Sequence, residues 1–183
     1  MTYHSQDLIE IFNDLFSVDY QTELVRGGHE PFYRPRRHKG AKHQLVFAHN
    51  FFQSGLHEIA HWCIAGAERR TLEDYGYWYK PDGRTPGEQE QFLAVEVKPQ
   101  SLEWIFSSAC EKPFYVSLDN LDGSPQDVSF FKGEVQKKAI ELVKGGLPLR
   151  AQRFKNALVG RYSNPERFEA YWQHVEQTNI LPL

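Results

Sequence analysis

Apolar residues recur at helical spacing near the start of the chain. After Ser5, an apolar residue follows every three or four positions, at Leu8, Ile11, Phe12, Leu15 and Phe16. This spacing predicts an amphipathic helix from about Ser5 to Phe16, with Ser5 as its N-cap. The segments DYQTELVRGG and QLVFAH have the composition of strands, and the first ends at a Gly-Gly turn.

The segment between these strands, YRPRRHKGAKH, combines Pro and Gly with seven Arg, Lys or His residues. Such a cluster is most often a solvated loop, and a docking surface is the less frequent alternative. The second strand leads directly into HNFFQSGLHEIAHWCIAG, residues 49–66, which predicts a helix that ends at Gly66.

The middle of the chain alternates β-favouring, turn-forming and helical stretches. TLEDYGYWY predicts a strand, KPDGRTPG a loop, and PGEQEQFLAVEV a helix that begins at Pro86 and is broken or kinked at Pro99. SLEWIFSSAC restarts the helical pattern, and FYVSL predicts a short extended piece. Three helical blocks follow, DVSFFKGEVQKKAIELVKGG, PLRAQRFKNALVGRY and NPERFEAYWQHVEQT. We predict an α+β fold, helix-rich with a small sheet, as a single domain over residues 1–183.

Composition narrows the class of protein. With 183 residues, 40% hydrophobic, 25% charged and a net charge of −3, the chain is typical of a soluble globular protein and lacks the basic excess of a nucleic-acid binder. The N-terminal sequence lacks the pattern of a signal peptide, and no apolar run is long enough to span a membrane, so we expect a cytoplasmic protein. Cys63 and Cys110 offer no disulfide framework or CxxC motif, and we expect two buried reduced thiols.

The motif HEIAH in the predicted helix carries the chemistry. Residues four apart lie on one helix face, so His57 and His61 can bind one cation, while Glu58 lies about 100° further round. HExxH is the signature of zinc metallopeptidases, in which the glutamate is the general base. Two histidines and one carboxylate also form the facial triad of non-haem iron(II) oxygenases. The spacing leaves both functions open, beside a coincidental match in which two core histidines bind no metal.

A metal site needs a third protein ligand, and Glu96 is the residue we favour. It shares a predicted buried helix face with Phe92 and Leu93, and an ionised carboxylate there needs a partner or a metal. Glu88 and Glu90 lie in the first helical turn, where acidic residues interact favourably with the helix dipole and stay solvated.

Four segments together resemble the bacterial elongation factor P hydroxylase family, over most of the chain. They are HNFFQSGLHEIAHWCIAGAERR, DYGYWYKPDGR, VEVKPQSLEW and PFYVSLDNL. The resemblance implies an iron(II)-dependent hydroxylase that uses molecular oxygen and acts on the β-lysylated lysine of elongation factor P. It also implies that His57, His61 and Glu96 hold the metal. The basic loop at residues 34–43 matches no motif of this family.

If the protein is a hydroxylase of this kind, further residues have expected roles. Glu58 could orient a ligand or meet the cationic substrate, or be a solvated helix acid. Asp74 and the aromatic residues Tyr77, Trp78 and Tyr79 could line a pocket for a long cationic side chain, because aromatic faces attract ammonium groups. The alternative for these aromatic residues is core packing. We expect no nucleic-acid or membrane partner.

Overall fold

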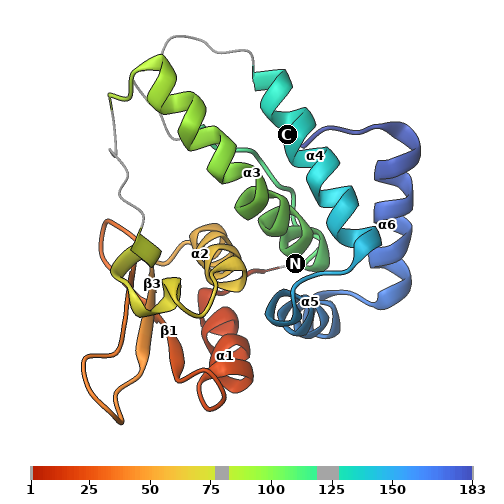
Figure 1. Ribbon diagram of the computed structural model, residues 1–183. Helices are drawn as coiled ribbons and strands as arrows, with labels where there is room; N and C mark the ends of the chain where they lie inside the picture. The colour runs from red at the N-terminus through yellow and green to blue at the C-terminus, as the bar shows by residue number, and fades with distance from the viewer. Residues whose placement is uncertain (1, 77–82, 119–127, 183) are drawn as a thin grey trace. The chain divides into compact units, whose positions relative to one another are not determined.

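In the computed structural model, which describes residues 2–76, 83–118 and 128–182, the chain forms two compact units (Figure 1). The first unit contains residues 1–77 and 148–158, and the second contains residues 78–147 and 159–183. The expected single domain stays a prediction. Within the described ranges, no helix is long and apolar enough to cross a membrane.

The first unit packs two helices against a three-stranded sheet. Its elements are α1 (Ser5–Phe16), β1 (Thr22–Arg26), β2 (Phe32–Arg34), β3 (His43–Phe47), α2 (Phe52–Ile64), the 3-10 helices η1 (Arg69–Thr71) and η2 (Glu73–Gly76), and the first ten residues of α5 (Leu149–Tyr162). The strand order is β1-β3-β2, with β1 parallel and β2 antiparallel to β3. Helix α1 contacts β1, α2 contacts β3, and the two helices contact each other. The expected strands and both helices are therefore confirmed, with β2 as an additional strand. The N-cap of α1 is His4, so the prediction that Ser5 caps this helix is wrong.

Aromatic packing and one close approach hold α2 in this unit. The Trp62 ring lies 4.9 Å from the Phe12 ring and 4.8 Å from the Phe16 ring, centroid to centroid. Gly55 allows the two helices to approach, because an added Cβ there would lie 2.8 Å from Leu8 Cδ1. Trp62 and Leu8 are fully buried. Burial of such side chains fixes the helix that carries the two histidines.

The second unit is helical. Its elements are α3 (Pro86–Ala109), the last four residues of α5, α4 (Val128–Gly145) and α6 (Pro165–Thr178). Helix α3 contacts both α4 and α6, and Trp104 of α3 lies 5.1 Å from Trp172 of α6 between ring centroids. Ser101 Oγ donates a 2.9 Å hydrogen bond to the Val135 carbonyl of α4. The three predicted C-terminal helical blocks are thus confirmed.

The predicted strand at residues 71–79 is wrong for its described part. Residues 73–76 form η2, and three consecutive residues, Asp74, Tyr75 and Gly76, have φ values of 44°, 59° and 71°. A positive φ is incompatible with a strand. The Asp74 carboxylate accepts a 2.7 Å hydrogen bond from the Tyr33 amide, and this tertiary contact overrides the β propensity of the aromatic residues. Residues 77–79 lie outside the described ranges.

A break at Pro99 is also wrong, because α3 continues from Pro86 to Ala109, and a kink there stays a prediction. A proline inside a helix removes the hydrogen bond to the carbonyl four residues earlier, here that of Val95, and its ring crowds this carbonyl. Val95 is 38% exposed, so water can reach this turn, while packing against α4 stabilises the following turns. Overall the described residues contain six α-helices and one small sheet, which agrees with the expected helix-rich α+β class.

Candidate metal-binding site

The two motif histidines lie together on α2. Their Nε2 atoms are 3.0 Å apart and their ring centroids 4.7 Å apart. For metal–nitrogen bonds of about 2.1 Å, this separation suits two ligands on adjacent positions of one ion. Their donor atoms thus converge as the spacing predicts.

These imidazoles lie on the half-buried face of α2 and not in the hydrophobic core. The buried positions of the helix are Phe52, Gly55, Leu56, Ile59, Ala60, Trp62 and Cys63. Ser54, His57, Glu58, His61 and Ile64 are only partly buried and follow one another at helical spacing. The apolar positions therefore bury one side of the helix, and the HExxH side chains remain on the side that a ligand can reach.

Two arginines cap the C-terminal end of α2. Arg150 of α5 donates from Nη2 to the carbonyls of Cys63 (3.1 Å) and Ala65 (2.5 Å). Arg70 donates a 2.7 Å hydrogen bond to the same Ala65 carbonyl. The Arg150 guanidinium also lies over the Trp62 ring, 4.5 Å from its centroid. Cations at this end satisfy unpaired helix carbonyls and interact favourably with the helix dipole.

Cys63 is not a suitable ligand, although it lies two residues after His61. It is buried on the core side of α2, and burial raises the pKa of its thiol to about 12. Cys110 is also buried and free, and burial raises its pKa as well. Both thiols therefore match the expected buried, reduced state.

Tyr75 is a residue that the sequence analysis missed. It is 5% exposed, and its hydroxyl has no hydrogen-bond partner among the residues that the structure describes. Its ring stacks on Tyr33 with centroids 4.5 Å apart. Burial raises the pKa of Tyr75 well above its usual value, and the charge of Glu58 adds to this. The buried Tyr75 phenol thus interacts electrostatically with Glu58 of the motif, and it lies on a left-handed turn that no sequence pattern predicts.

Asp74, predicted to line a substrate pocket, lies in this same turn. Its side chain is exposed, and its carboxylate holds the Tyr33 amide of β2. This contact gives Asp74 a structural role, and pocket lining stays a prediction. The other expected pocket residues, Tyr77, Trp78 and Tyr79, lie outside the described ranges.

In the second unit, Glu96 lies on a buried polar stripe of α3. Glu96 is 3% exposed, whereas Glu88 and Glu90 are exposed, as predicted. Gln100 Nε2 lies 3.5 Å from Glu96 Oε2, and Gln100 is itself fixed by Ser117, donating to its carbonyl (2.8 Å) and accepting from its amide (3.0 Å). The carboxylate therefore has a neighbour that can orient it.

Further polar residues of α3 share this buried face. Gln89 is 1% exposed and donates a 2.7 Å hydrogen bond to the Leu118 carbonyl. Arg84 Nε donates to Gln89 Oε1 (2.7 Å), and its guanidinium lies 3.9 Å from the centroid of the Phe92 ring. Gln89 and Gln100 were not predicted from the sequence. Their spacing of seven and four residues from Glu96 is the signal that could have identified them.

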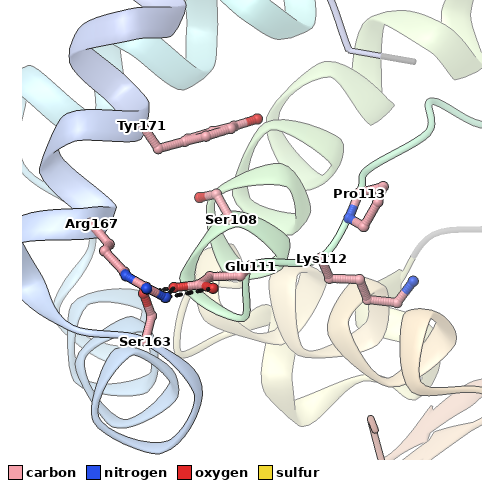
Figure 2. A pocket seen from close by; sticks show the side chains of 7 residues that line it. All are labelled: Ser108, Glu111, Lys112, Pro113, Ser163, Arg167 and Tyr171. Atoms are coloured by element: carbon pink, nitrogen blue, oxygen red, sulfur yellow. Dashed lines mark hydrogen bonds and ion pairs between the residues drawn. The ribbon is translucent and has the colours of Figure 1, made fainter. Parts of the chain in front are cut away.

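A pocket of about 460 Å³ lies elsewhere in the second unit (Figure 2). Its lining residues are Ser108, Glu111, Lys112, Pro113, Ser163, Arg167 and Tyr171. Glu111 accepts hydrogen bonds from Arg167 (2.9 and 3.1 Å) and from Ser163 (2.8 Å). These side chains satisfy one another, and the pocket contains no imidazole, so it lacks the donor set of a metal site.

Comparison with known proteins identifies the family. A family model for elongation factor P hydroxylase matches residues 11–171. The elongation factor P lysine hydroxylase of Haemophilus influenzae is 46% identical over 166 residues, which cover 91% of this chain and 93% of that protein. These matches confirm the predicted class of enzyme, a hydroxylase, and do not favour the alternative zinc metallopeptidase. The chain belongs to the elongation factor P hydroxylase family.

Proposed function

We propose that this protein hydroxylates a lysine side chain of elongation factor P at a metal ion held by His57, His61 and Glu96. The observation that carries the proposal is the pair of imidazoles on α2, with Nε2 atoms 3.0 Å apart, in a chain of this family. Two imidazoles and one carboxylate are a donor set that can hold a metal ion. Together they would form the zincin-like arrangement expected from the sequence, an HExxH helix and a downstream glutamate.

The residues present fit iron(II). Imidazole and carboxylate ligands suit this ion, and three protein ligands leave positions open for other molecules. When bound, iron(II) would supply the activation of molecular oxygen that zinc, which has no redox chemistry, does not. The reaction replaces a C–H bond of the substrate by C–OH. The second oxygen atom leaves as water, which takes two electrons from a donor and two protons.

Each ligand has a defined task. His57 and His61 would bind through Nε2, so each ring would carry its proton on Nδ1. Glu96 would supply an oxygen, oriented by Gln100. Glu58 lies on the half-buried face of α2. There its carboxylate would attract a β-lysylated lysine, which carries positive charge. Since elongation factors act in translation, the reaction would take place in the cytoplasm.

The direct test is intact-mass analysis of lysylated elongation factor P after incubation with the iron(II)-loaded protein, an electron donor and air. We expect a gain of one oxygen atom, no gain without oxygen, and no gain with the zinc-loaded protein. Equal activity of the zinc-loaded and iron-loaded forms would refute the proposed chemistry.

Glu58→Gln separates this function from that of a peptidase. A peptidase would lose its general base and nearly all activity. For the hydroxylase we expect full metal content and part of the turnover. Complete loss of hydroxylation in a metal-replete Glu58→Gln protein would show that this carboxylate has a larger role.

A further inference from the structure

The segment between β2 and β3 concentrates positive charge on an otherwise acidic chain. Residues 34–42, here called the basic segment, contain five cations and no acidic residue. The cations are Arg34, Arg36, Arg37, Lys39 and Lys42. Because the whole chain carries −3 and the basic segment +5, the remaining residues carry −8. A charge reversal of this size within one chain makes a strong local field.

None of the five cations forms an ion pair with any residue that the structure describes. Arg34 lies over the Phe32 ring, 4.8 Å from its centroid, and Arg36 donates to the neutral side-chain oxygen of Gln21. Four of the five cations are exposed, and Arg34 is partly buried. Ion pairs with the described residues therefore leave this charge uncompensated.

The basic segment has a defined shape. Arg34 pairs with Gln44 across the antiparallel strands. The Arg36 amide donates to His43 Nδ1 (3.2 Å), and the Ala41 amide donates to the His38 carbonyl (3.2 Å). These contacts hold the loop in one conformation, so a partner would not have to order it on binding.

Contacts within the first unit connect the base of the basic segment to the end of α2 that carries His61. The His43 ring stacks on the Tyr33 ring, with centroids 5.9 Å apart. The Tyr33 hydroxyl donates to the Arg70 carbonyl (2.8 Å), and Arg70 in turn caps Ala65, four residues after His61. Burial lowers the pKa of His43, and the charges of Arg36 and Arg70 lower it further. Both arginines therefore act electrostatically on His43.

We propose that the basic segment is a docking surface for an acidic face of the protein substrate. The inference rests on the proposed function, which supplies a folded protein as the substrate. A nucleic acid fits less well, because its phosphate charge extends beyond a nine-residue loop onto a chain whose remaining residues carry −8. Charge complementarity of this kind raises the association rate and fixes the orientation of the partner.

The test uses Arg37→Glu/Lys39→Glu, because both side chains are exposed and neither makes a contact that the fold needs. The control is Lys132→Glu/Lys137→Glu on α4, which changes the net charge equally. With lysylated elongation factor P at low salt, we expect KM of the basic-segment variant to rise about tenfold or more, with kcat within about twofold. Salt should shrink the difference from wild type. With a short peptide that carries the same modified lysine, all three proteins should have similar kinetics.

Binding is measured separately, with labelled elongation factor P and zinc-loaded protein, so that it does not depend on turnover. Weaker binding by the basic-segment variant alone supports the docking surface, even if hydroxylation itself is not observed and the proposed function fails. The docking surface is overturned if the wild type does not bind, if the variant binds as tightly as the wild type, or if binding by the control is weakened equally. The proposal is also overturned if the wild type binds a labelled RNA, the basic-segment variant does not bind it, and the KM of this variant for elongation factor P is unchanged.

Discussion

The two helices that carry the proposed ligands are positioned by different forces. Helix α2 presents His57 and His61 on a half-buried face, and the helix itself is held by apolar packing on its other side and by arginines at its C-terminal end. Helix α3 buries Glu96 beside Gln100, which is fixed by two hydrogen bonds to Ser117. The histidines thus depend on the placement of their helix, and the carboxylate depends on its immediate polar neighbours.

Removal of a ligand from either helix should have the same and largest effect. For His57→Ala and for Glu96→Ala we expect loss of stoichiometric metal and a fall in hydroxylation beyond the 10–100-fold that outer-shell changes typically cause. Both proteins should remain folded, because a catalytic metal site contributes less to folding than a structural one. Elemental analysis and circular dichroism measure the two effects.

The matched control for Glu96 is Glu90→Ala, since Glu90 is an exposed glutamate on the same helix. Its metal content and activity should stay near wild type. Stoichiometric metal in a folded Glu96→Ala protein would mean that the third ligand lies elsewhere and that the two helices do not share one function.

Loss of the cap on α2 should be the next largest effect. Arg150→Met removes two charge-assisted hydrogen bonds to the Cys63 and Ala65 carbonyls and the contact with Trp62. We expect a loss of about 2–3 kcal/mol in the free energy of unfolding, measured by urea denaturation. Arg150→Lys keeps the charge without the forked geometry and should lose less. An Arg150→Met protein of wild-type stability would show that apolar packing alone holds this helix.

Gln100→Leu tests whether a local polar contact on α3 orients Glu96. Without the Gln100 amide, Glu96 loses the neighbour that orients it, and we expect metal affinity to fall about tenfold. Gln89→Leu is the control, because Gln89 lies on the same helix, seven residues before Glu96, and donates a comparable hydrogen bond to the Leu118 carbonyl. A chelator competition assay gives the affinities. Equal losses in the two variants would assign the effect to general loosening of α3.

Much of the site could be predicted from the sequence because its signals are local. The spacing of His57 and His61 determines their convergence on one helix, and the apolar neighbours of Glu96 indicate its burial. The turn at Asp74 and Tyr75 could not be predicted, because a tertiary hydrogen bond to Tyr33 and three positive φ values override the β propensity of that stretch. The continuation of α3 through Pro99 likewise depends on packing against α4, which no local pattern contains.

The smallest effect should come from the N-terminal end of α3. Thr85 and Glu88 form a capping box, in which the Thr85 hydroxyl accepts from the Glu88 amide (3.4 Å) and the Glu88 carboxylate accepts from the Thr85 amide (2.7 Å). Thr85→Ala removes the first of these bonds and should cost about 1 kcal/mol of unfolding free energy in urea. Metal affinity should be unchanged, because Glu96 lies three turns further along and is oriented by Gln100. Thr85→Ala could instead weaken metal binding as much as Gln100→Leu does. The placement of α3 as a whole would then govern the position of the Glu96 carboxylate, and the local polar contacts would not. In that case both helices position their ligands in the same way.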